Sequence, residues 1–95
     1  MTVRIAVIQH EVRPGQVEAN RSRALELAAQ ALQQQPDIIL FPEGILMGYT
    51  DNTRELAEPV DGPTTRAFQK LLRGTSTLIL YGLIAGVSIN QLFVA

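Results

Sequence analysis

One carboxylate stands inside the most apolar stretch of the chain, DIILFPEGILMGY. Glu43 lies between Pro42 and Gly44, and Phe41 and Ile45 flank this trio. Apolar neighbours that exclude water disfavour the charged form of a carboxyl group, a condition that suits a general base. Pro42 stiffens the approach to Glu43, because its ring fixes φ and it has no N–H group. The stretch predicts a partly desolvated proton acceptor at Glu43. The alternative is a solvated loop acid, or one that accepts hydrogen bonds from backbone N–H groups of the following turn.

Few other side chains could take part in catalysis. The chain has no cysteine, and therefore no thiol nucleophile, disulfide or thiolate metal site. Its one histidine, His10, has no second His or Cys at ligand spacing, so we expect no metal site. Its one lysine, Lys70, stands at helical spacing from Arg66 and Arg73, which predicts a solvated helix face.

The spacing of apolar residues indicates which elements position Glu43. Residues 3–9, VRIAVIQ, predict a buried strand, and residues 38–41 predict a second strand that is wholly apolar. Between them, residues 17–35 show helical spacing that Pro36 ends. Strands without polar alternation are typical of a sheet covered on both faces. The order strand, helix, strand predicts a right-handed crossover between parallel strands, whose carboxyl ends are where ligands bind and where Glu43 lies.

The second half of the chain continues the alternation. Residues 44–60 show no clear period and are long for a loop, and loops of that length are often functional. Residues 61–74 predict a helix, and residues 77–85 and 87–95 predict two further strands. The last strand is apolar and would lie at a sheet edge, which proteins normally protect. We therefore expect a sheet that is truncated or completed by another chain, with poor solubility or association into a homo-oligomer.

Composition limits the classes of function. Hydrophobic residues make up 46% and charged residues 18% of 95 residues, which suits one small folded domain. With a net charge of −1 and no run of basic residues, nucleic acid is not an expected partner. The glycines form no nucleotide-binding motif. No signal peptide and no apolar run long enough for a membrane span are recognisable, so we expect a soluble cytoplasmic protein.

The whole series of motifs resembles the N-terminal part of the carbon–nitrogen hydrolase, or nitrilase, superfamily. The resemblance rests on VRIAVIQ, Asn20 in a helix, DIILFPEGILMGY, DGPTT and LILYGL, in that order. It implies an α/β fold: the N-terminal portion of an αββα sandwich, in the order β-α-β-loop-α-β-β with a parallel βαβ start. Residues 1–95 would then be a partial carbon–nitrogen hydrolase domain.

The resemblance also implies a chemistry. The family's enzymes cleave nitriles, amides or N-carbamoyl compounds with a Glu-Lys-Cys triad and without a cofactor. A cysteine thiolate attacks the substrate carbon, a lysine stabilises the developing charge and a glutamate moves the protons. Glu43 matches that glutamate. Tyr49, in the family's Gly-Tyr pair, is expected either to line the substrate pocket or to anchor its loop.

Two members of the triad are missing from this chain. It has no cysteine, and Lys70 falls in a predicted helix, well before the place of the family's lysine. The chain alone is therefore expected to be inactive, and its small-molecule substrate is expected to meet only the intact enzyme. The alternative is a non-catalytic α/β module for binding or assembly, paired with another subunit through its open sheet edge.

Overall fold

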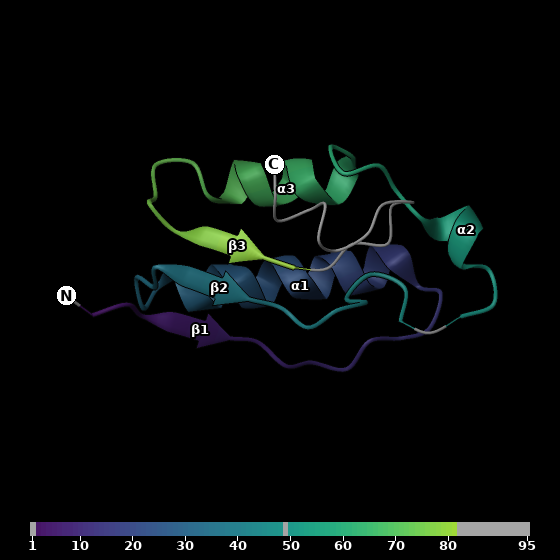
Figure 1. The fold of residues 1–95 in the computed structure, drawn as a ribbon, viewed down its shortest axis with the longest axis horizontal. Helices are drawn as coiled ribbons and strands as arrows, with labels where there is room; N and C mark the ends of the chain where they lie inside the picture. The colour runs from purple at the N-terminus through teal and green to yellow at the C-terminus, as the bar shows by residue number, and fades with distance from the viewer. Residues whose placement is uncertain (1, 49, 82–95) are drawn as a thin grey trace.

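The computed structural model describes residues 2–48 and 50–81, which form an α/β arrangement. Figure 1 shows the three strands side by side, with their arrows pointing the same way. The elements follow in the order β1 (Ile5–Val7), α1 (Val17–Leu32), β2 (Ile38–Leu40), α2 (Thr53–Leu56), α3 (Pro63–Leu71) and β3 (Leu78–Leu80). The predicted α/β class is confirmed, whereas the fourth strand expected at residues 87–95 lies outside the described residues.

The sheet has the order β1-β2-β3 and both pairs of strands are parallel. Ala6 is paired with Ile39, and Ile39 with Ile79, so one register runs across all three strands. Parallel neighbours need a crossover connection. Here α1 lies in the connection between β1 and β2, and α3 in the connection between β2 and β3. The predicted βαβ start is confirmed.

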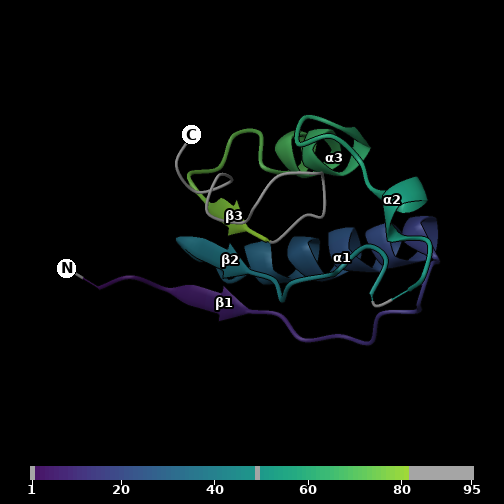
Figure 2. The same cartoon turned by 45° about the vertical axis from the view of Figure 1, so that its right-hand side comes forward.

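The core lies between the two longer helices and one face of the sheet (Figures 1 and 2). Ile39, at the centre of β2, is completely buried, as are Ala24 and Ala28 of α1. Alanine at these helical positions has no side chain beyond Cβ, which lets the helix approach the strands closely. Phe68 of α3 stacks at 5.4 Å between ring centroids on Phe41, the residue after β2. These contacts fix α1 and α3 on the same side of the sheet.

The opposite face of the sheet is apolar and uncovered by the described residues. Ile5, Val7 and Leu78 are 55%, 64% and 62% exposed, and Leu40 is 39% exposed. The expectations of a buried first strand and of a sheet covered on both faces are therefore wrong for this part of the chain. The physical reason is that both crossover helices lie on one face. We refer to these four side chains as the outer face.

The helices end close to the predicted residues. Helix α1 ends at Leu32, before the predicted residue 35, because the chain turns and Gln35 adopts a left-handed φ of 51° ahead of Pro36. Pro63 occupies the first turn of α3, as proline's fixed φ allows. Residues 44–60, expected to lack periodic structure, contain one short helix, α2. Among the described helices, none is long and apolar enough to cross a membrane.

Candidate functional site

Glu43 follows the carboxyl end of β2, as the sequence predicts. The strand ends at Leu40, and the backbone N–H of Phe41 still donates to the carbonyl of Leu80 in β3, at 2.9 Å. The chain then leaves the sheet at Pro42, and Glu43 comes next with an exposed side chain. Its carboxylate makes no hydrogen bond or ion pair with the described residues. Glu43 is therefore at the expected end of the sheet and open to solvent there.

The expected desolvation of Glu43 by its sequence neighbours is wrong for the described chain. Ile45, Leu46 and Met47 are at most 2% exposed and Phe41 is 4% exposed, because their side chains enter the core. The carboxylate does not follow them inward and stays in water. Apolar residues adjacent in sequence lower the local dielectric only when their side chains surround the charge. Any group that shields Glu43 from water must come from outside the described residues.

The turn after Glu43 is tightly held. Gly44 and Gly48 have φ values of 76° and 62°, a left-handed conformation that glycine adopts without strain. The N–H of Gly48 donates to the carbonyl of Gly44 at 3.0 Å, which closes the turn. The N–H of Gly15, in the loop after β1, donates to the carbonyl of Met47 at 2.9 Å. The exits from β1 and β2 are thus hydrogen-bonded to each other next to the candidate base.

His10 follows β1 at the same end of the sheet. Its Nδ1 lies 3.1 Å from the carbonyl oxygen of Glu11, and since a carbonyl only accepts, the Nδ1–H group donates this hydrogen bond. Its Nε2 is buried and has no hydrogen-bond partner within the described part of the chain. The ring meets Phe41 edge-on at 6.1 Å. His10 therefore packs against its neighbours, and none of these contacts is with Glu43.

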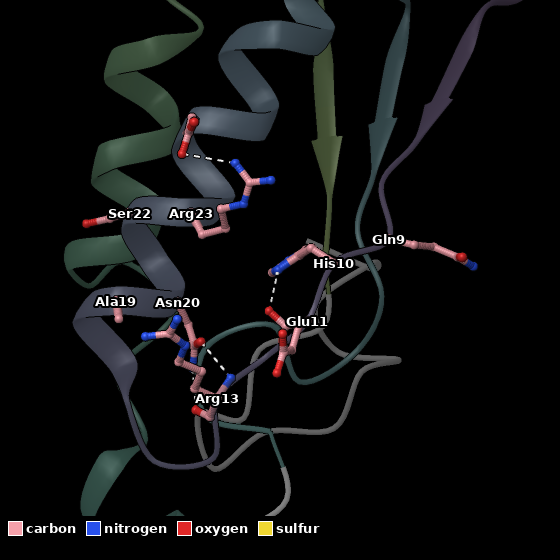
Figure 3. A pocket seen from close by; sticks show the side chains of 9 residues that line it. Gln9, His10, Glu11, Arg13, Ala19, Asn20, Ser22 and Arg23 are labelled. Atoms are coloured by element: carbon pink, nitrogen blue, oxygen red, sulfur yellow. Dashed lines mark hydrogen bonds and ion pairs between the residues drawn. The ribbon is translucent and has the colours of Figure 1, made fainter.

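A cleft of about 500 Å³ lies between α1 and the loop after β1 (Figure 3). His10, Asn20 and Arg23 line it, and Glu43 does not. The guanidinium of Arg23 is paired with Glu26 at 3.0 Å, so it is not held ready for an anionic ligand. In Figure 3 the side chain of Asn20 turns from α1 toward Arg13. Because Glu43 does not line the cleft, the cleft is not the candidate catalytic site.

A polar cluster that the sequence analysis did not identify joins α1, the loop before α3 and α3 itself. Glu58 is only 8% exposed and Thr64 is completely buried. The carboxylate of Glu58 accepts from the backbone N–H of Thr64 at 2.8 Å and from Nη2 of Arg21 at 2.8 Å. Nε of Arg21 donates to Oγ1 of Thr64 at 2.9 Å. Glu58 thereby caps the first turn of α3, whose own N-cap residue, Gly62, has no side chain.

The cluster lowers the pKa of Glu58. Burial by itself would raise that pKa, but the hydrogen bonds from Thr64 and the hydrogen bond and charge of Arg21 outweigh it. The pKa therefore lies below its ordinary value of 4.5, and Glu58 is a charged structural group. The sequence held no local signal for it, because Glu58 stands four residues before the N-cap Gly62 and Asp61 stands closer.

Tyr81, the last described residue before the chain's final segment, ties β3 to α3. Its ring contacts Phe68 at 5.1 Å and its hydroxyl is hydrogen-bonded to the hydroxyl of Thr65. Burial raises the pKa of Tyr81, the hydrogen bond with Thr65 opposes that rise, and the nearby charge of Glu58 adds to it. The phenol stays protonated and its role is structural.

The remaining candidate residues are simply located. Lys70 lies in the last turn of α3 and is exposed, as are Arg66 and Arg73, so the predicted solvated face is confirmed. Tyr49 lies outside the described residues, and its expected role stays a prediction. Within the part of the chain that the structure describes, no three His, Asp or Glu side chains lie close enough to hold a metal ion.

Comparison with known proteins gives a consistent result. The model of the carbon–nitrogen hydrolase family matches residues 4–91. A Pseudomonas protegens protein named "Hydrolase in pqqF 5'region" is 33% identical over 84 residues, which cover 85% of this chain and 29% of that protein. A glutamine-dependent NAD(+) synthetase of Acinetobacter baylyi is 28% identical over 81 residues, which cover 85% of this chain and 15% of the synthetase. This chain thus spans less than a third of the length of either relative.

Proposed function

This chain belongs to the carbon–nitrogen hydrolase family, and from that premise we propose that it is the N-terminal part of an enzyme that hydrolyses non-peptide C–N bonds, with Glu43 as its general base. The substrates would be nitriles, amides or N-carbamoyl compounds. The name of the Acinetobacter relative adds glutamine, whose side chain carries an amide, to the compounds worth testing.

One observation carries this proposal. The acid of the family motif follows a parallel strand at its carboxyl end, with a hydrogen-bonded backbone on both sides and an exposed carboxylate. A general base must be held in place and yet reach the proton that it removes. An exposed carboxylate on a fixed backbone meets both conditions once a nucleophile is brought to it.

In the proposed mechanism, Glu43 accepts the proton of a cysteine thiol, and the thiolate attacks the substrate carbon. A lysine stabilises the negative charge that develops on the substrate. Glu43 then gives its proton to the leaving nitrogen and takes one from the water that hydrolyses the acyl intermediate. As the C–S bond breaks, Glu43 returns this proton to the cysteine sulfur, which restores the thiol and the carboxylate. This chain has no cysteine, and Lys70 is remote from the motif in sequence and exposed on α3. The thiol and the ammonium group must therefore be supplied from outside these residues.

The first test uses the chain alone. We expect no turnover of aliphatic nitriles, simple amides, glutamine or N-carbamoyl amino acids. A rate that Glu43→Gln abolishes would contradict the claim that the chain lacks part of its catalytic machinery.

The second test supplies the missing part with a chimera. Residues 1–95 replace the aligned segment of the Pseudomonas relative. The chimera and the unaltered relative, called the parent, are then assayed with the same compounds. A chimera that circular dichroism shows to be folded should hydrolyse the parent's substrates, and Glu43→Gln should lower its kcat/KM by at least about 100-fold. Glu11→Gln, which changes an exposed acid at the same end of the sheet, is the matched control. Equal losses in the two variants, or a folded but inactive chimera of an active parent, would refute the proposal.

A further inference from the structure

Asn20 is a buried polar residue whose two N–H donors and side-chain oxygen are all hydrogen-bonded. It lies in the second turn of α1 and is 3% exposed. Its Oδ1 accepts from the backbone N–H of Arg13 at 2.9 Å, and its Nδ2 donates to the carbonyl of Arg13 at 2.8 Å. The second Nδ2 proton goes to the carbonyl of Leu46 at 2.6 Å. A carboxamide has two N–H donors. One of those of Asn20 joins α1 to the turn after Glu43, across 26 residues of sequence.

The bond to Leu46 reaches the middle of the turn that follows Glu43. The three carbonyls of this turn that have described donors are those of Gly44, Leu46 and Met47. Gly48 and Gly15 supply backbone donors, and Asn20 is the one side chain among these described donors. This side chain comes from a helix packed in the core, which is a more rigid support than a loop.

We propose that Asn20 is a positioning residue: by fixing the turn of residues 44–48, it holds Glu43 at the distance and angle that proton transfer requires. This inference rests on the proposed role of Glu43. The side chains of Ile45, Leu46 and Met47 already bury the turn, but burial is non-directional and tolerates small shifts. A hydrogen bond of fixed length and direction removes that freedom. Misplacement of a catalytic group by about 1 Å costs roughly 100-fold in rate.

The alternative is that Asn20 only adds stability, as any satisfied buried amide does. The two roles predict different patterns of change. A loss of stability acts on the whole fold, whereas a loss of positioning acts first on the turn and on kcat. Thr77 offers a matched control, because it is also buried and its Oγ1 donates to the carbonyl of Pro36 at 2.6 Å. That bond lies at the amino ends of β2 and β3, the opposite end of the sheet from Glu43.

The first experiment measures amide hydrogen exchange in the 95-residue chain by NMR. The reporters are the N–H groups of Gly15 and Gly48, bonded to the turn, and the N–H of Leu78, which donates to the carbonyl of Asp37 in the sheet. In Asn20→Ala we expect exchange at Gly15 and Gly48 to rise at least tenfold more than at Leu78. In Thr77→Val, amide exchange at Gly15 and Gly48 should not rise more than exchange at Leu78. An equal rise at all three amides in Asn20→Ala would show a purely global effect and overturn the proposal.

The second experiment measures kinetics in the chimera. Asn20→Ala should lower kcat by about 100-fold with KM changed less than about threefold. Thr77→Val should leave kcat and KM near the values of the unsubstituted chimera. If Asn20→Ala does not fold, Asn20→Leu, which keeps about the same size and loses both donors without adding a charge, takes its place. Retained kcat in Asn20→Ala, with activity abolished in Glu43→Gln, would refute positioning and leave the proposed function intact. Retained activity in Glu43→Gln would refute the proposed function, while the exchange pattern would still test the hold on the turn.

Discussion

At the scale of single residues, two glutamates show that burial depends on neighbours in space more than on neighbours in sequence. Glu43 stands in the most apolar stretch of the chain and is exposed. Glu58 stands in a mixed and partly polar stretch, yet it is 8% exposed. The difference comes from partners, because Glu58 meets Arg21 and the N-terminus of α3, which compensate a buried charge. No described group does the same for Glu43.

The first residue-scale prediction concerns Glu58. Glu58→Ala removes the cap of α3 and leaves the guanidinium of Arg21 without its carboxylate, so we expect the free energy of unfolding to fall by about 2 kcal/mol. Glu26→Ala, which breaks an ion pair between side chains that are half exposed, should cost less than about 0.5 kcal/mol. Urea denaturation at pH 7 measures both variants. A smaller loss for Glu58→Ala than for Glu26→Ala would contradict the capping role.

The effect should depend on pH in a definite direction. Because the folded state lowers the pKa of Glu58 below 4.5, its contribution is fully present above that value and is lost as the pH falls through the lowered pKa. The stabilities of the wild-type chain and Glu58→Ala should therefore converge in acid. Denaturation curves at several pH values between neutral and acid would check this, and a constant difference at all of them would rule it out.

At the scale of elements, the three short parallel strands are supported from one side only. Both crossover helices pack on the face that contains Ile39, and the outer face remains apolar and exposed. The αββα sandwich implied by the resemblance would lay a second sheet against this outer face. Strands without polar alternation suit that arrangement, since they are buried on both faces when the layers are complete.

The two faces of the sheet should respond differently to truncation of side chains. Ile39→Ala empties a fully buried site at the centre of β2 and is expected to cost about 3 kcal/mol of unfolding free energy. Ile5→Ala removes the same atoms from a side chain that is 55% exposed and should cost less than about 1 kcal/mol in this chain. Urea denaturation compares them directly. Similar losses would mean that the outer face is covered in solution.

At the scale of the whole molecule, the outer face is the main source of exposed apolar surface among the described residues. Val7 and Leu78 are each more than 60% exposed, on the two edge strands of the described sheet. Contiguous apolar surface on a sheet promotes association. The expected homo-oligomer is not tested by the structure of a single chain, and it stays a prediction.

We therefore expect the isolated chain to associate in a concentration-dependent way through the outer face. Light scattering should show the mass rising with concentration, and Val7→Lys should reduce that rise because a charge on the face must be buried in the complex. Gln30→Lys, at an exposed position of α1, adds the same charge elsewhere and should leave association unchanged. A monomer at all concentrations, or an equal effect of both substitutions, would refute this prediction.

The sequence determined the order and type of the described elements, except for the short helix α2, and the end of the sheet that carries Glu43. These follow from local information, because apolar period, proline and glycine act over a few residues. Tertiary structure alone decided which carboxylate is buried, which sheet face the helices cover and what Asn20 holds. Each of these depends on contacts between segments tens of residues apart, such as Arg21 with Glu58 or Asn20 with Leu46. The pattern of a segment does not specify its distant partner. Local patterns therefore identified the motif around Glu43 but did not predict that this side chain is exposed.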